Sequence, residues 1–310
     1  MIRTTIDWLG YLALRIVMCI VLAIRLETCR MYAGYLATFC CRVLRIRAAV
    51  VDENLRHAFP RLSPCQRLRV THQMWVHLFL MIVEIAHARR KIHDTNWREH
   101  IDLRNGRKLI AHVLEDRPLV MVSGHFGNFE LAGYLLGVLG VPTFTVARPL
   151  KNPFIDQFLN EFRGAKGQVM LSKSGSSGEI DQLLSSNGTL LLLGDQSGGP
   201  KGCWTEFFSR PASVHKAIGV FALMNDAPLA VCFSRRSSGN LQFEIGMAAF
   251  ADPRDNTEHV QSVAALSTWF TKQLETIIRR SPDQYWWLHR RWKDKRESHN
   301  AKRRQRRQAA

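Results

Sequence analysis

The chain has 310 residues, of which 46% are hydrophobic and 22% are charged, and its formal net charge is +17. This composition excludes a disordered chain and suffices for one large domain or two small ones. A basic excess of this size predicts an anionic partner, namely a membrane surface, a nucleic acid or an acidic protein. Part of the excess is local, because residues 290–310 contain ten Lys or Arg and only two Asp or Glu.

The first apolar stretch, residues 8–24, is interrupted only by Arg15. Its length is at the lower limit for crossing a bilayer, and an arginine in its middle is costly there. Two interpretations stay open, an uncleaved signal anchor and a helix that lies in the membrane interface. Arg3 alone precedes the stretch, whereas five arginines lie in residues 25–47, so the positive-inside rule places the rest of the chain in the cytoplasm. We expect a membrane anchor over residues 1–30.

Residues 31–93 have a helical pattern. One helix is predicted over 51–59, where Pro60 ends it, and Ser63 with Pro64 marks the start of the next. From about residue 101 the pattern changes to strands that alternate with helices, which predicts an α/β fold with a mixed, mostly parallel sheet flanked by helices. The expected strands cover 119–122, 142–148, 168–173, 189–196 and 229–236, with an antiparallel-looking pair around 241–247.

A corner between a strand and a helix carries the first candidate site residues. His125 follows the strand, and Glu130 stands in the first turn of the helix. A carboxylate in that place would fix the tautomer of the imidazole and stabilise its protonated form, as a general base requires. The alternative is a structural histidine with a helix-capping glutamate, because an isolated H-x4-E pattern is weak.

Further polar residues follow neighbouring strands, where open α/β sheets place their sites. Arg148 follows the second strand and Asp195 follows the very apolar stretch 189–194. A base, a cation and carboxylates at one sheet edge suit acyl or phosphoryl transfer. The alternative for Arg148 is a salt bridge that anchors a turn. The sequence lacks Walker A, G-x-S-x-G and GxGxxG motifs and any metal-ligand spacing, and its seven cysteines match reduced packing residues, so we expect no metal site.

Four segments in order resemble the bacterial lipid A biosynthesis acyltransferases, the late lauroyl and myristoyl transferases. They are GHFGNFE (124–130), ARPLKNPFID (147–156), DQSGGPKGCWTEFFSRPAS (195–213) and PDQYWWLHRRWK (282–293). The resemblance covers nearly the whole chain. It implies a glycerolipid-acyltransferase-like fold over residues 31–293. From its basic composition, we expect the tail over 294–310 to be disordered. The resemblance also implies a cytoplasm-facing enzyme of the bacterial inner membrane.

The implied reaction moves a fatty acyl chain from acyl carrier protein, or coenzyme A, to a hydroxyl of a lipid A precursor, without another cofactor. By the same resemblance His125 is the general base, Glu130 its partner, Arg148 an oxyanion or donor-binding group and Asp195 a further active-site acid. The hydroxyl would attack the thioester directly, without an acyl-enzyme.

The start of the predicted helix adds two candidates to this site. We expect backbone amides around Gly127 and Asn128 to stabilise the tetrahedral anion, because they lie at a helix N-terminus. Phe129 and Val214–His215 depart from the family's usual residues, which bears on substrate choice more than on chemistry.

Other functions stay open at this stage. The same chemistry could act on a glycerophospholipid, an ornithine lipid or a phosphoinositol mannoside, and a catalytically dead membrane scaffold is a further alternative. A nucleic-acid-binding protein that uses the basic tail is a different class, but the sequence shows no nucleic-acid fold signature, so we expect no nucleic acid partner.

Overall fold

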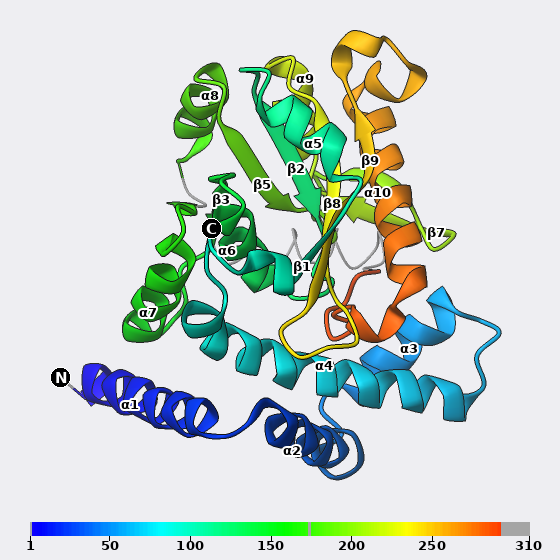
Figure 1. Ribbon diagram of the computed structural model, residues 1–310. Helices are drawn as coiled ribbons and strands as arrows, with labels where there is room; N and C mark the ends of the chain where they lie inside the picture. The colour runs from blue at the N-terminus through cyan, green and yellow to red at the C-terminus, as the bar shows by residue number, and fades with distance from the viewer. Residues whose placement is uncertain (1, 173–174, 293–310) are drawn as a thin grey trace.

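The computed structural model describes residues 2–172 and 175–292, so the predicted tail at 294–310 lies outside the described residues. Its centre is a seven-stranded sheet (Figure 1). Every neighbouring pair in the sheet is parallel except β8 and β9, which are antiparallel. The mixed, mostly parallel sheet of the predicted fold class is thereby confirmed. In spatial order the strands are β1 (Ile101–Arg104), β9 (Phe243–Ala251), β8 (Leu229–Arg236), β2 (Leu119–Ser123), β5 (Thr189–Leu193), β3 (Phe144–Ala147) and β4 (Val169–Ser172).

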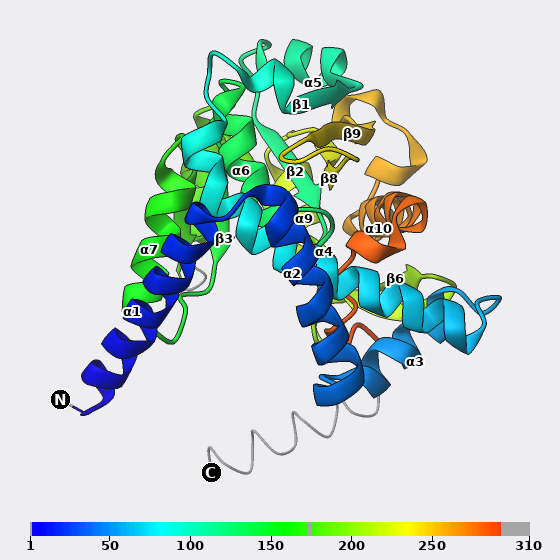
Figure 2. The ribbon, with the colours of Figure 1, turned by 60° about the horizontal axis from the view of Figure 1, so that its bottom comes forward.

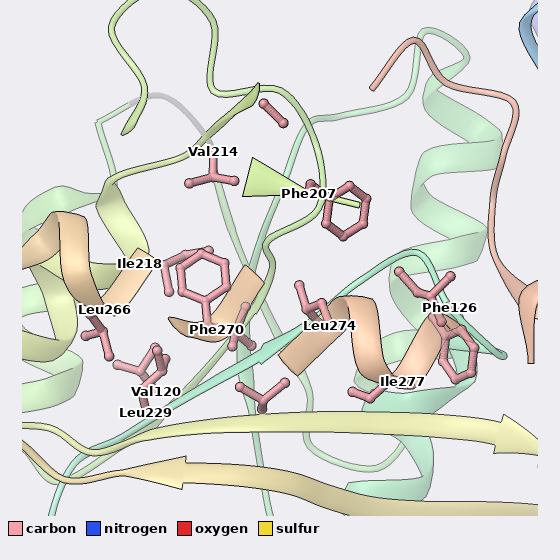
Figure 3. Close-up of a cluster of buried hydrophobic side chains, with 14 of the residues drawn as sticks. Val120, Phe126, Phe207, Val214, Ile218, Leu229, Leu266, Phe270, Leu274 and Ile277 are labelled. Atoms are coloured by element: carbon pink, nitrogen blue, oxygen red, sulfur yellow. The ribbon is translucent and has the colours of Figure 1, made fainter. Parts of the chain in front are cut away.

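Both faces of the sheet are covered, as the continuous apolar runs of β2 and β5 require. Alternate residues of each strand point to opposite faces. Val120 and Leu190 therefore belong to one buried cluster, whereas Met121 and Leu191 belong to the other. Figure 3 shows part of the first cluster, in which Phe270 lies among strand and helix side chains. The first cluster draws on α8 (Ser177–Ser185), α9 (Ala217–Met224) and α10 (Val263–Arg280), and the second on α5 (Gly106–Val113), α6 (Phe129–Val138) and α7 (Pro153–Gly164).

The N-terminal third is helical, as predicted. Ser63 caps the long helix α4 by accepting a hydrogen bond from the Gln66 N–H, while the Gln66 side chain accepts from the Ser63 N–H, a complete capping box. Below α4 lie two shorter helices and a π-helical turn (Figure 1). The elements are α1 (Ile2–Ala23), α2 (Leu26–Thr38), η1 (Phe39–Leu44), α3 (Ala48–Ala58) and α4 (Pro64–Lys91).

Two features lie outside the predicted pattern. The edge strand β1 is too short to show a period, and β6 (Cys203–Phe207) pairs with β7 (Arg210–Val214) in a separate antiparallel hairpin. Its two-residue turn has positive φ at Phe208 and Ser209, a conformation usually signalled by Asn or Gly. The hairpin packs on α10 beside the main sheet. The short turns η2 (Trp97–Glu99), η3 (Pro253–Asp255), η4 (Glu258–Val260) and η5 (Pro282–Gln284) complete the fold.

Candidate active site

A cavity opens where two neighbouring strands separate. β5 pairs with β2 along all of its five residues, but it pairs with β3 only at Leu190 and Leu191. Beyond that point the strand ends diverge, and a cavity of about 640 Å³ opens between them. Helix α6 connects β2 to β3 over one face and α8 connects β4 to β5 over the other, so the chain order switches here. Such a switch point is where open α/β sheets bind their ligands.

His125 enters this cavity from the end of β2. Its Nδ1 lies 2.7 Å from Oδ1 of Asp195, and its backbone N–H donates to Oδ2 of the same carboxylate at 2.9 Å. Asp195 is 1% exposed and follows β5, the strand next to β2. Because Nδ1 faces a carboxylate, the neutral ring carries its proton on Nδ1 and presents the lone pair of Nε2 to the cavity.

Charge and hydrogen bonding set the proton affinity of this pair. Burial lowers the pKa of His125, but the charge and hydrogen bond of Asp195, with a contribution from Glu130, raise it above its ordinary value. Burial raises the pKa of Asp195, yet the charge of His125 and the hydrogen bonds from it hold that pKa well below its usual range. Asp195 therefore stays ionised whenever His125 accepts a proton.

Gln196 covers the other nitrogen of the imidazole. Its Nε2 lies 3.1 Å from Nε2 of His125, within hydrogen-bonding distance of the free lone pair. Gln196 is exposed and also lines the cavity. Its amide thus occupies the position that an attacking hydroxyl needs, and a bound acceptor must displace it.

The predicted pairing of His125 with Glu130 is wrong. Glu130 instead binds Arg163 of α7, whose Nη2 and Nε lie 2.8 Å and 3.0 Å from Oε2. The first turn of α6 points Glu130 along the cavity wall toward α7, while the neighbouring strand brings Asp195 directly under the imidazole. Glu130 and Arg163 both line the cavity, so Glu130 remains a site residue with a different partner.

The predicted oxyanion donors at the start of α6 are also contradicted. The Gly127 N–H donates to the Gln284 carbonyl at 2.8 Å, and the Asn128 N–H donates to the Ser234 carbonyl at 3.0 Å. Both amides are therefore occupied and neither residue lines the cavity. Gly127 has φ +58°, and a Cβ there would stand 1.7 Å from the Ser234 carbonyl oxygen, so this position needs glycine.

Asn128 has a structural function. Its Oδ1 accepts from the Leu131 N–H at 3.1 Å as the N-cap of α6, and its Nδ2 donates to Glu84 at 2.7 Å. Glu84 forms a buried ion pair with Arg236, which also contacts Nδ1 of His77 at 2.6 Å. Nε2 of His77 lies 3.1 Å from the Gly127 carbonyl oxygen and helps to fix the loop after His125.

The C-terminal motif holds the same loop from the other side. The Trp286 N–H donates to the His125 carbonyl at 3.0 Å, and Tyr285 forms an isolated β-bridge with Phe126. His289 lies with its ring centroid 5.9 Å from that of His125, and burial lowers its pKa to about 4, so it is neutral near pH 7. The residues 284–289 therefore position the catalytic loop, a contact that the spacing of the motif alone did not reveal.

Arg148 lies where sequence analysis placed it, just after β3 at the rim of the cavity. The residue is exposed, and its guanidinium makes no ion pair with another described residue. The predicted alternative of a turn-anchoring salt bridge therefore finds no partner in residues 2–172 and 175–292. The lining also contains polar residues, Thr145, Gln168, Ser176 and Ser177, and apolar residues on the side of α8 and α9, namely Val146, Ile180, Leu192, Ile218 and Phe221. The cavity thus combines charged groups with an apolar side that suits a hydrocarbon chain.

Comparison with known proteins decides the family. The sequence model of the bacterial lipid A biosynthesis acyltransferases matches residues 1–294. The chain belongs to this family. Among similar proteins, the lipid A biosynthesis lauroyltransferase of Escherichia coli K12 is 26% identical over 258 residues, which cover 81% of each chain. The palmitoleoyltransferase of the same strain is 25% identical over 256 residues, covering 81% of this chain and 80% of the relative.

A more distant relative and one solved structure complete the comparison. The lipid A biosynthesis acyltransferase of Haemophilus influenzae is 22% identical over 239 residues, covering 76% of this chain and 72% of that protein. The crystal structure of the 1-acyl-sn-glycerophosphate acyltransferase PlsC from Thermotoga maritima matches with a TM-score of 0.39 and 12% identity, covering 87% of this chain and 100% of that one. Family membership makes this protein an O-acyltransferase of lipid A biosynthesis, and its apolar N-terminal helix fits an association with a membrane.

Proposed function

We propose that this chain transfers a fatty acyl group from the thioester of acyl carrier protein, or of coenzyme A, to a hydroxyl of a lipid A precursor. The reaction would take place on the cytoplasmic side of the bacterial inner membrane. The observation that carries the mechanism is the His125–Asp195 pair in a cavity that also has an apolar side toward α8 and α9.

Nε2 of His125 takes the proton from the acceptor hydroxyl once that hydroxyl has displaced Gln196. The oxygen attacks the thioester carbonyl, and the resulting tetrahedral anion collapses with loss of the thiolate. The imidazolium then returns the proton to the thiolate, so that the products are an ester and a free thiol. No acyl-enzyme is formed, because the acceptor attacks the donor directly.

Asp195 stabilises the imidazolium that forms in the transition state, and its buried carboxylate does so without reorganising. The free guanidinium of Arg148 and the amide of Gln196 stand at the same end of the cavity and would stabilise the developing oxyanion. The apolar side of the cavity would hold the acyl chain. Ile180 of α8 and Phe221 of α9 would then limit the length of the chain that fits.

The basic charge supports the choice of partners. Acyl carrier protein is acidic, and a lipid A precursor carries phosphates, so a chain with a net charge of +17 would attract both. The second candidate is the same transfer to another lipid acceptor, because Arg148 would bind the phosphate of a glycerophospholipid in the same manner.

Mass spectrometry of lipids from cells with the gene, without it, and with the His125→Ala variant tests this function. We expect lipid A to lose one acyl chain in both defective strains. An unchanged lipid A pattern with a missing acyl chain on another lipid would overturn the acceptor but leave the chemistry intact. Incubation of the purified protein with acyl carrier protein or coenzyme A thioesters then identifies the donor.

A further inference from the structure

Helix α1 is long and apolar enough to cross a membrane, but it is attached to the acyltransferase domain near both of its ends. Near its start, the Asn152 side chain of α7 donates to the Asp7 carbonyl at 2.7 Å. Near its end, Nε2 of His87 in α4 lies 3.2 Å from the Val21 carbonyl. At 1.5 Å per residue these two attachments are about 21 Å apart along the helix, most of the distance across a hydrocarbon core of about 30 Å.

The helix that α1 lies against, α7, has an apolar side and a polar, exposed side. Tyr11 packs on Phe154 and Phe158 of α7, but the exposed side of α7 carries Gln157 and Glu161. Glu161 accepts from the neutral Gln157 amide and forms no ion pair with another described residue, so a bilayer that surrounded the middle of α1 would also surround a carboxylate without a counter-charge, which costs free energy. While α1 keeps its contacts with α7 and α4, it cannot extend across a bilayer away from the domain.

Arg15, the residue that makes a membrane span costly, faces the domain. Its guanidinium donates to the Tyr11 hydroxyl at 2.8 Å and lies 5.4 Å from the ring centroid of Phe158. From Trp8 onward the rest of α1 is apolar and largely open, and Met18 is its one buried residue among those described. This division, with the charge toward the protein and the apolar side outward, suits a helix that lies half-immersed in an interface.

The same apolar surface continues beyond α1. Here the N-terminal arm means residues 2–46, which comprise α1, α2 and η1. Of the twenty-two exposed large hydrophobic residues in the described part of the chain, fifteen lie in this arm, including Tyr35 and Val43, which are 64% and 65% exposed. The buried side of α2 consists of small residues, Cys29, Ala33 and Ala37, that pack against α4. The larger apolar residues of α2 therefore point away from the domain.

Both helices of the arm lie in one layer. Figure 1 shows α1 and α2 along one side of the molecule beneath α4, and Figure 2, the turned view, shows them diverging from the turn at residues 24–25. Two helices in one layer with outward apolar faces form a broad, flat apolar surface. Soluble proteins normally expose apolar residues singly and not in a continuous surface of this kind.

Charge identifies the occupant of this surface. The arm carries Arg25, Arg30, Arg42 and Arg45, all exposed, and none of them forms an ion pair with another described residue. Arginines around an apolar surface are complementary to the headgroups of anionic lipids. Each arginine near such a membrane contributes favourably to the free energy of binding. A second protein copy would leave these like charges facing one another.

We propose that the N-terminal arm is a monotopic anchor that lies in the plane of an anionic bilayer, with both ends of α1 on the same side of the membrane as the acyltransferase domain. α7 joins this anchor to the site, because it contacts α1 through Phe154 and holds Glu130 through Arg163. The cavity would then open close to the lipid surface, and a lipid acceptor would enter it without leaving the membrane region.

Protease access to tags on the full-length chain tests the topology. One tag precedes Met1 and a second at the C-terminus reports the side of the domain. We expect both tags to be protected in intact spheroplasts and both to be cleaved in inverted inner-membrane vesicles. Cleavage of the N-terminal tag in spheroplasts, with the C-terminal tag protected, would show that α1 spans the membrane and would overturn the proposal.

Binding to lipid vesicles tests the second half of the surface. We expect Tyr35→Asp and Val43→Asp each to lower the fraction bound to phosphatidylethanolamine–phosphatidylglycerol vesicles by about tenfold. Each substitution removes an apolar side chain that is exposed in the protein and would be buried in the bilayer. Leu114→Asp and Met224→Asp are matched controls, because both residues are 78% exposed on other helices. Equal losses in the controls, or dimerisation through the arm without vesicle binding, would overturn the proposal. Neither test measures acyl transfer, so its outcome is independent of the proposed reaction.

Discussion

The carboxylate of Asp195 accepts two hydrogen bonds from one residue, His125, through its Nδ1–H at 2.7 Å and its backbone N–H at 2.9 Å. This double contact fixes both the direction of the imidazole and the position of the loop that carries it. The base is therefore oriented before any substrate arrives, and the energetic cost of orienting it is met during folding.

Replacement of the base is the first prediction. We expect His125→Ala to lower the rate of acyl transfer by about 10²–10⁴-fold or more, the usual contribution of a general base. The rate is measured with purified protein and acyl donor, and thermal unfolding confirms that the variant is folded. His93→Ala is the control, because His93 is exposed just after α4 and its ring forms a hydrogen bond only with the Arg90 carbonyl within the described part of the chain. Transfer at the normal rate in His125→Ala would remove this residue from the mechanism.

The second prediction concerns pH. A base works when unprotonated, and Asp195 raises the pKa of His125, so the wild-type rate should fall as pH drops through a value above 6.5. Asp195→Asn removes the charge that raises this pKa. The acid limb of the pH–rate profile should therefore move to lower pH, while the maximal rate falls. A limb that moves to higher pH or stays in place would show that Asp195 does not control the proton affinity of His125.

The third prediction separates Glu130 from the base. Because Glu130 binds Arg163, we expect Glu130→Ala and Arg163→Ala to lower activity by similar factors and the double variant to lose little more. The pH–rate profile should move only slightly in all three variants. A double-variant cycle of turnover rates measures this coupling. The exposed pair Arg254 and Asp226 serves as a control, since its removal should leave the rate unchanged. Additive losses would show that Glu130 and Arg163 act separately.

The fourth prediction concerns Arg148, which lines the cavity and forms no ion pair with another described residue. We expect Arg148→Gln to lower kcat/KM by about tenfold or more, because it removes a charge-assisted contact to the substrate or the oxyanion. A rise in KM alone would identify a binding role, and a fall in kcat would identify stabilisation of the oxyanion. Arg107→Gln, on α5 away from the cavity, should change neither parameter. Unchanged kinetics in Arg148→Gln would exclude it from the site.

The fifth prediction concerns stability. Glu84 and Arg236 are both buried, and loss of the carboxylate would leave the guanidinium without its counter-charge. We expect Glu84→Gln to lower the free energy of unfolding by about 3–5 kcal/mol. Urea denaturation measures this change, and Asp226→Asn in an exposed ion pair should cost less than about 1 kcal/mol. A cost as small as that of the control would show that the buried network does not support the fold.

Much of the fold could be predicted because its signals are local. Pro60 and the Ser63–Pro64 pair mark helix ends through backbone constraints of single residues, and the apolar run of β5 requires cover on both faces. These effects act within a few residues. The hairpin of β6 and β7 gave no such signal, because Phe208 and Ser209 adopt positive φ through tertiary packing against the sequence preference of the turn.

The partners within the site depend on strand order, which sequence periodicity does not encode. His125 and Asp195 are 70 residues apart and meet only because β5 lies next to β2. Glu130 is close to His125 in sequence and was therefore the natural but wrong partner. The Gly127 amide was a reasonable oxyanion donor by its place at a helix start, but it is already bonded to the Gln284 carbonyl, more than 150 residues further on.

The contacts of residues 284–286 with the loop after β2 also determine when the enzyme can become active during its synthesis. The Gln284 carbonyl and the Trp286 N–H hold this loop, yet they are among the last described residues to leave the ribosome. The N-terminal arm is made first and is free to reach lipid while the catalytic loop still lacks its support. A chain that ended between residue 46 and residue 284 would keep the proposed anchor but would lack the contacts that hold the catalytic loop.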